Sequence, residues 1–202
     1  MKDLGVLKYL LGMEITFGDR SVSISQKKYI DDMLKIYDMH HCTHFKELPA
    51  PAGQRLTKAP FPLPPEESLA MREIKYRHAV GHLLYLTMVT RFDLSNVVRE
   101  LSRHMSNPSP THWGAVRWCM KYVSGTKAKK LHLGPFPCEG PLKLIGYSDS
   151  DWAGDTDTRR STTGYAFVLG TSADQICSGA ISVNSRLQPT VALSSTEAEY
   201  MA

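Results

Sequence analysis

Apolar and polar positions alternate with two different periods along the chain, and each change of period marks a new region. Residues 6–15 have the pattern of a strand, and Gly18 and Asp19 suit a turn into a second strand at 22–24. Apolar residues then recur at helical spacing from Tyr29 to Tyr37, and Ser25 is the expected helix cap. The first 48 residues are therefore predicted to hold a hairpin and a helix.

Prolines interrupt every periodic pattern in the next stretch. Six of the twelve prolines lie between Pro49 and Pro65, which predicts an extended linker over residues 49–73. Helical spacing returns in 76–84, 94–105 and 113–123. Asp93 and Thr111 are the expected N-caps, and Gly125 marks a helix end. The region from about 74 to 125 is therefore predicted to form a small helical bundle.

The hydrophobic pattern changes again from Leu142 onward, where short strand-like runs replace the helical spacing. These runs are 142–148, 163–169 and 180–185. Ser194 and Glu197 then form a capping box, which predicts a helix starting there. The order of three strands and one helix over residues 138–202 predicts a mixed sheet, and the whole chain is expected to be α+β or α/β.

Composition and charge narrow the class of protein without naming a function. With a net charge of +4 and a pI near 8.8, a nucleic-acid partner is permitted but not required. The four cysteines are far apart, which argues against a disulfide framework and a cysteine-rich zinc site. There is no long apolar run and no secretory signal, so we expect an intracellular protein, in cytoplasm or nucleus, without a membrane partner.

Acidic residues gather near one strand and at the start of the last predicted helix. Asp149 and Asp151 follow the strand at 142–148, and Glu197 and Glu199 open the helix. Carboxylates from these two places suit a hard cation such as Mg²⁺, and a pair of such ions can hydrolyse phosphodiesters. From the pattern alone, turn formation and solvated charge remain the commoner reading. A calcium loop is excluded because Arg160 stands where a bidentate glutamate is required.

Asp31 and Asp32 imitate the tyrosine-x-aspartate-aspartate motif of polymerases. That motif needs a hairpin, whereas here the pair lies inside a 3.6-residue apolar pattern. We therefore expect both residues to face solvent on a helix, and we expect no polymerase active site. The histidine-rich run from His40 to His44 has no second ligand pair and is expected to be a helix end and loop.

Several segments resemble one family of polyproteins. Residues 147–155, 159–165 and 191–200 read YSDSDWAGD, RRSTTGY and VALSSTEAEY, and they resemble the ribonuclease H domain of copia-type LTR retrotransposons. Upstream, residues 11–15, 25–30, 76–81 and 101–103 read LGMEI, SQKKYI, YRHAVG and LSR. These resemble the part of the same polyprotein's reverse transcriptase that follows its catalytic motif.

The resemblance implies four regions and a reaction. Residues 1–48 would end the reverse-transcriptase palm and begin the thumb, 49–73 would be the linker, 74–134 the helical thumb and connection, and 138–202 the first part of a ribonuclease H-like domain. The parent enzyme hydrolyses the RNA strand of RNA–DNA hybrids with two metal ions. Its catalytic and metal-binding aspartate and glutamate fall on Asp149 and Glu199, with Mg²⁺ or Mn²⁺ as the cofactor. Asp151 and Glu197 are rejected, Glu197 because the capping box already uses it.

The resemblance also implies partners and leaves an alternative. The expected partners are an RNA–DNA hybrid and the rest of the Pol polyprotein, and further catalytic aspartates belong to segments beyond this sequence. The candidate phosphate contacts are Lys127, Lys129, Lys130, Arg159 and Arg160, although a surface basic run is usually only solvated. Phe92, Val183 and Leu187 depart from the family pattern of proline, tryptophan and lysine. The alternative is therefore a non-catalytic nucleic-acid-binding or inert remnant of a decayed element.

Overall fold

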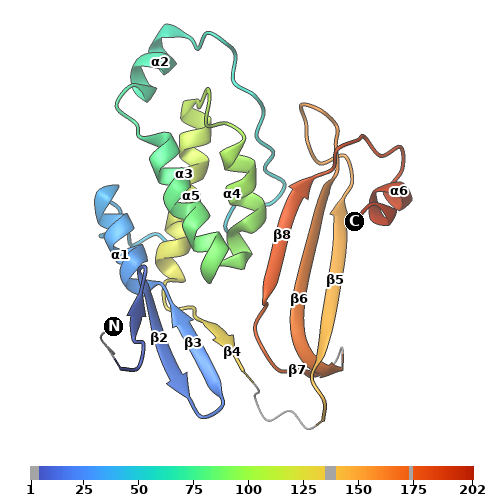
Figure 1. Cartoon of the computed structure of the whole chain (residues 1–202). Coiled ribbons are helices and arrows are strands. Elements are labelled where there is room, and N and C mark those ends of the chain that lie inside the picture. The colour runs from blue at the N-terminus through green and yellow to red at the C-terminus, as the bar shows by residue number, and fades with distance from the viewer. Residues whose placement is uncertain (1–4, 135–139, 173–174) are drawn as a thin grey trace.

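A computed structural model describes residues 5–134, 140–172 and 175–202 of the chain. They form an N-terminal sheet, a set of helices above it and a C-terminal sheet beside the helices (Figure 1). The mixed α and β fold class is the one the sequence predicts.

The N-terminal sheet is antiparallel and has the strand order β1-β2-β3-β4. Its strands are β1 Tyr9–Leu10, β2 Met13–Gly18, β3 Ser21–Ser25 and β4 Leu131–Leu133. The prediction of one strand over 6–15 is wrong, because Leu11 and Gly12 have φ values of 48° and 82° and turn the chain back on itself. Two successive positive φ values match the twist of a tight hairpin.

Strand β4 belongs to the N-terminal sheet although it follows the helices in the chain. It pairs with β3 in the register Val22↔Leu133, and the Ser23 hydroxyl lies 2.8 Å from His132 Nδ1. The strand lies after Gly125, where the predicted helical bundle ends, and no strand was predicted there. It fastens the end of the helical region to the N-terminal hairpin.

The helices predicted from apolar spacing are present and share one core. The bounds are α1 Lys27–Ile36, α2 Pro65–Met71, α3 Tyr76–Val89, the 3₁₀ helix η1 Phe92–Leu94, α4 Ser95–Ser102 and α5 Pro110–Gly125. Helix α2 lies inside the predicted linker, where Pro65 occupies the first turn and leaves no helical hydrogen bond unmade. The core is formed by residues from all six of these elements, among them Leu34, Leu83, Leu101 and Met120, all at most 1% exposed.

Two expected N-caps are wrong, and in each case a neighbouring residue explains the difference. Asp93 lies within η1 and uses its carboxylate to bind Arg91 instead of capping α4. Helix α5 is capped by Ser109 rather than Thr111, because Pro110 begins the helix and the ring of His112 completes a capping box. At α1 the cap position is Gln26, although the Ser25 hydroxyl accepts a hydrogen bond from the Lys27 N–H.

The C-terminal sheet is antiparallel, with β6 at its centre. Its elements are β5 Lys143–Asp151, β6 Thr162–Ser172, β7 Gln175–Ile176, β8 Ser182–Leu187 and the helix α6 Ser195–Tyr200. Strand β5 pairs along one side of β6, and β7 and β8 pair along the other. The predicted cap of α6 is confirmed, since the Ser194 hydroxyl accepts a hydrogen bond from the Glu197 N–H at 3.1 Å.

Two further observations bear on the expected class of protein. Across the described residues, no helix has the length and apolar character needed to cross a membrane. Cys42 and Cys119 are free thiols, but Cys177 is disulfide-bonded, which the spacing of the cysteines did not predict.

Candidate functional site

Asp149 and Glu199, the two predicted metal ligands, come from strand β5 and helix α6. Asp149 lies two residues before the end of β5, opposite Gly164 of β6. The backbone N–H of the next residue, Ser150, donates to Glu199 Oε1 at 3.3 Å. The capping box therefore starts α6 at a point where Glu199 reaches the strand one residue from Asp149. Both side chains are exposed.

The two faces of the sheet are used differently near this point. Successive side chains on a strand point to opposite faces. Ser150 and its partner Thr163 share the face that α6 covers, because Gln188 Nε2 donates both to the Thr163 hydroxyl and to the Ala198 carbonyl. The Asp149 side chain points to the other face, so a cation shared with Glu199 would have to lie at the open edge of β5, where Glu199 meets the strand. No cluster of three or more metal-binding side chains occurs in the described ranges. The role of Asp149 and Glu199 as a metal pair thus stays a prediction.

The other acids of this region have protein partners. Arg55 of the linker lies 2.8 Å from Asp151 Oδ2, and the Lys58 N–H donates to both oxygens of Asp157. Arg103, the residue that follows α4, donates to Asp155 Oδ1 at 2.9 Å. The loop between β5 and β6 is therefore attached to the linker and to the helices by its carboxylates.

The Asp155 carboxylate is the most deeply placed of these acids, with 2% of its side chain exposed. Burial opposes its ionisation. Hydrogen bonds from Thr158 and Arg103 and the charge of Arg103 outweigh that effect and hold its pKa below the usual value. Asp155 is thus an ionised carboxylate that fixes the loop.

The linker itself is held on the helical side by a row of hydrogen bonds. The Leu56 N–H donates to Glu100 Oε1 at 2.8 Å, and Asn107 Nδ2 donates to the Ala59 and Pro60 carbonyls. His112 Nδ1 accepts from the Ser109 N–H, so its Nε2 carries the proton and donates to the Thr57 carbonyl at 2.9 Å. Residues 55–60 therefore lie as a strap between the helices and the sheet.

The five candidate phosphate contacts do not form one patch. Lys127 pairs with Asp31 at 2.7 Å, and Lys129 donates to the Tyr122 hydroxyl at 3.3 Å. These two and the exposed Lys130 lie between α5 and β4, below the helices in Figure 1, whereas Arg159 and Arg160 lie in the β5–β6 loop at the opposite end of the C-terminal sheet. Their role in binding nucleic acid stays a prediction.

Asp31 and Asp32 lie on helix α1, as predicted, and not on a hairpin. Asp32 is exposed and pairs with Lys35 one turn away. Asp31 is only partly exposed because of its ion pair with Lys127, so the expectation that both face solvent freely is wrong for Asp31. The helical conformation removes the geometry that a polymerase motif needs.

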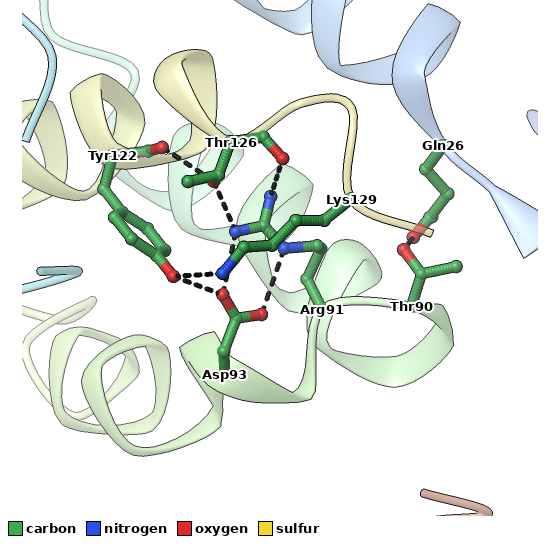
Figure 2. A network of polar contacts seen from close by, with 7 residues as sticks. All are labelled: Gln26, Thr90, Arg91, Asp93, Tyr122, Thr126 and Lys129. Carbon is green, nitrogen blue, oxygen red and sulfur yellow. Dashed lines mark hydrogen bonds and ion pairs between the residues drawn. The ribbon is translucent and has the colours of Figure 1, made fainter. Parts of the chain in front are cut away.

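The sequence analysis missed a buried polar network around Arg91 (Figure 2). The Arg91 side chain is 1% exposed, and its guanidinium donates to both oxygens of Asp93 at 3.0 and 2.8 Å and to the Thr126 hydroxyl at 2.7 Å. The Tyr122 hydroxyl donates to Asp93 Oδ2 at 2.7 Å. This network connects the turn after α3 with the end of α5. The Arg-x-Asp spacing was its only signal in the sequence.

The sequence is similar to several known proteins, but no solved structure matches it. The chain is 40% identical over its whole length to a retrovirus-related Pol polyprotein from transposon TNT 1-94 of Nicotiana tabacum. It is 34% identical over its whole length to an uncharacterized mitochondrial protein of Arabidopsis thaliana, of which it covers 76%. It is 47% identical over 65% of its length to secreted RxLR effector protein 161 of Plasmopara viticola, of which it covers 86%. No family model and no solved structure matches.

The relatives differ greatly in length. The chain spans only 14% of the tobacco polyprotein, and a similarly small share, 12%, of a Pol polyprotein from transposon RE2 of Arabidopsis thaliana that is 36% identical to it. The same region thus occurs both within long transposon polyproteins and in short proteins. The chain belongs to the family of short proteins represented by the mitochondrial protein of Arabidopsis thaliana, and this family shares its sequence with one region of the retrovirus-related Pol polyproteins of plant transposons.

Proposed function

We propose that this chain is the part of a copia-type Pol polyprotein that joins the end of the reverse transcriptase to the first part of ribonuclease H. The parent protein would hydrolyse the RNA strand of an RNA–DNA hybrid with Mg²⁺ or Mn²⁺. The observation that supports this most directly is the hydrogen bond from the Ser150 N–H to Glu199 Oε1, which puts a helix carboxylate beside the strand that carries Asp149.

The neighbouring contacts support the choice of these two acids. Glu197 Oε2 accepts the Leu193 N–H at 2.7 Å, and Asp151 pairs with Arg55, so both rejected acids have structural roles. Asp149 has no ion pair among the described residues and is exposed, which leaves its oxygens open to a cation. A hard cation held by two carboxylates completes its shell with water and substrate phosphates. In a hydrolytic site these residues would hold the ion that activates water or stabilises the leaving oxygen.

The experiment is a titration of the isotope-labelled chain with Mn²⁺, which broadens NMR signals near a bound ion. Broadening is expected at residues 148–151 and 197–200, and it should disappear in both Asp149→Asn and Glu199→Gln. Asp19→Asn, in the turn between β2 and β3, is the matched control and should leave the broadening unchanged. Broadening that persists in both site variants would show that these residues do not hold a metal, and the non-catalytic alternative would then be favoured.

A further inference from the structure

The outer edge of strand β5 carries backbone groups that no described part of the chain pairs. Strand β5 is the first in the sheet order β5-β6-β7, and helix α6 lies beside its C-terminal end (Figure 1). The Ser150 N–H points to this outer edge, because it donates to Glu199 Oε1. Backbone groups point to alternate sides along a strand, so Leu144, Gly146 and Ser148 also direct their N–H and carbonyl groups outward.

The hydrogen bonds of β6 agree with this assignment. Gly146 lies opposite Phe167, whose carbonyl accepts a hydrogen bond from the Ile181 N–H at 2.8 Å on the side away from β5. Gly146 and Phe167 therefore exchange no hydrogen bonds with each other. Within the described part of the chain, the backbone groups of Leu144, Gly146 and Ser148 have no partner at the outer edge.

The open part of this edge is short and symmetrical. At one end Glu199 occupies the Ser150 N–H. At the other end β5 begins at Lys143, and the nearby Pro141 has no N–H to donate. The outward-facing residues between these limits are Leu144, Gly146 and Ser148. Such an edge can pair antiparallel with a second copy of itself about a two-fold axis at Gly146.

The side chains match in the register centred on Gly146. Two copies paired in this way put Lys143 opposite Asp149 of the second copy. Neither residue has an ion pair among the described residues, and both are exposed. On the same face, Ile145 lies opposite Tyr147 of the second copy. Opposite charges and pairs of an aromatic with a β-branched side chain both stabilise neighbouring antiparallel strands.

The adjacent registers match less well. A register centred on Tyr147 puts Lys143 opposite Asp151. That carboxylate already lies 2.8 Å from Arg55 within the same chain. A register centred on Ile145 puts Lys143 opposite the Tyr147 ring and gives it no carboxylate. Of the three registers, only the first pairs Lys143 with an acid that has no other ion pair in the described part of the chain.

Gly146 suits the two-fold axis of such a pair. The ring of Phe167 lies over it, since an added Cβ would lie 2.7 Å from Phe167 Cε1. Glycine in a strand often marks a place where another backbone approaches closely. The two glycines would face each other without side chains, and Phe167 of each copy would cover the apolar face beside them.

We propose that the chain forms a two-fold homodimer in which the β5 edges of two copies join their C-terminal sheets, in the register centred on Gly146. The contact is small, so the expected dissociation constant is about 1 to 100 µM. This inference concerns assembly and goes beyond the proposed function. Because Asp149 also belongs to the proposed metal site, the dimer is measured in EDTA.

The first test is sedimentation velocity of the 202-residue chain at about 1 to 200 µM, which should show a monomer in equilibrium with a dimer. Lys143→Asp and Asp149→Lys should each weaken the dimer about tenfold, because like charges then face each other at both ends of the contact. The variant that carries both substitutions restores opposite charges and should return to within about threefold of the parent. Lys75→Asp and Asp19→Lys, at exposed positions outside β5, are the matched controls and should change the affinity less than about twofold.

A second test removes one outward N–H. Proline is tolerated on an edge strand where its nitrogen faces solvent, so Ser148→Pro should leave the bonds between β5 and β6 intact and weaken the dimer about tenfold. Circular dichroism melting checks the fold of each variant, and the charge variants carry the test if Ser148→Pro does not fold. A chain that stays monomeric over the whole range, assembly beyond a dimer, or a double charge variant as weak as the single ones would overturn the proposal.

Discussion

The guanidinium of Arg103 lies 2.9 Å from the buried carboxylate of Asp155, and this pair joins helix α4 directly to the loop between β5 and β6. The loop is also bound to the linker through Asp151 and Asp157. The position of the C-terminal sheet against the helices therefore depends on charged groups and a strap of backbone rather than on one continuous apolar core.

The first prediction concerns how much the ion pair between Arg103 and Asp155 stabilises the fold. Asp155→Asn and Arg103→Ala should each lower the free energy of unfolding by about 2 kcal/mol, because each leaves a partly or fully buried charge without its partner. The double variant should reveal a coupling of about 1 kcal/mol in urea unfolding. The exposed pair Lys35 and Asp32 is the control, and Lys35→Ala should cost less than about 0.5 kcal/mol. Additive losses would mean that the Arg103–Asp155 contact contributes nothing.

The second prediction concerns Arg91, whose side chain is 1% exposed. Arg91→Lys keeps the charge but loses the two parallel hydrogen bonds to Asp93, so it should destabilise the chain by about 2 to 3 kcal/mol. Arg117→Lys, at an exposed position of α5, is the control and should be nearly neutral. Thermal melting compares the two, and equal melting temperatures would contradict the importance of the network.

The third prediction concerns pH. His104 is buried against His112, with ring centroids 4.0 Å apart. Burial, followed by the nearby His112 and Arg103, lowers the pKa of His104 to about 4, below its ordinary value of 6.5. Between these pH values the unfolded chain binds a proton that the folded chain does not, so stability should fall as pH drops from about 6.5 to about 4, by up to about 3 kcal/mol.

The variant His104→Leu tests this source of pH dependence. Urea unfolding at several pH values should show a flatter profile between about pH 4 and 6.5 than in the parent chain. Below that range both proteins should lose stability together, because the lowered pKa values of Asp93 and Asp155 make their ionised forms part of the folded state. If the stability of both proteins fell equally between pH 6.5 and pH 4, groups other than His104 would cause the pH dependence.

The fourth prediction concerns the first hairpin turn. At Gly12 the backbone has a φ of +82°, and an added Cβ would lie 3.3 Å from Tyr29 Cδ2. Gly53 also has a positive φ, +72°, but open space around it. Gly53→Ala should cost about 1 kcal/mol from backbone strain alone, and Gly12→Ala should cost about 2 because packing adds to the strain. Equal losses would show that Tyr29 moves aside freely.

The fifth prediction concerns catalysis by the isolated chain. It should not cut the RNA strand of a labelled RNA–DNA hybrid at a useful rate in abundant Mg²⁺, because Asp149 and Glu199 would hold one ion weakly and leave a second ion poorly held. Cleavage by the chain that is lost in Asp149→Asn would show that the site has more ligands than these two.

Local patterns in the sequence predicted elements whose stability is mostly local. The apolar spacing from Tyr29 to Tyr37 gave α1, and the Ser194 capping box gave α6, because each depends on residues within a few positions of one another. Asp93 was misassigned as a cap because its carboxylate binds Arg91, two residues earlier, and Tyr122, which tertiary packing brings to it from α5. The preference of aspartate for N-cap positions does not take account of other side chains that compete for its carboxylate.

For the candidate site too, the sequence predicted the local elements but not the contacts between distant residues. The segments carrying Asp149 and Glu199 could be identified as a strand and a helix start, and the structure has both. The sequence could not show which acids bind Arg55, Arg103 and the Lys58 N–H. Arg55 and Lys58 lie in the linker, about a hundred residues before their acids, and Arg103, which follows α4, lies about fifty residues before Asp155.

Strand β4 has a consequence for synthesis of the chain on the ribosome. Ser23 and His132, which meet across β3 and β4, are 109 residues apart. At about 5 to 20 residues per second, β3 emerges roughly 5 to 20 s before its partner strand exists. During that interval one edge of the hairpin is open to pairing with other nascent chains. The helices between the two strands are synthesised before β4, so the free edge of β3 stays unpaired until the chain has been made as far as residue 133.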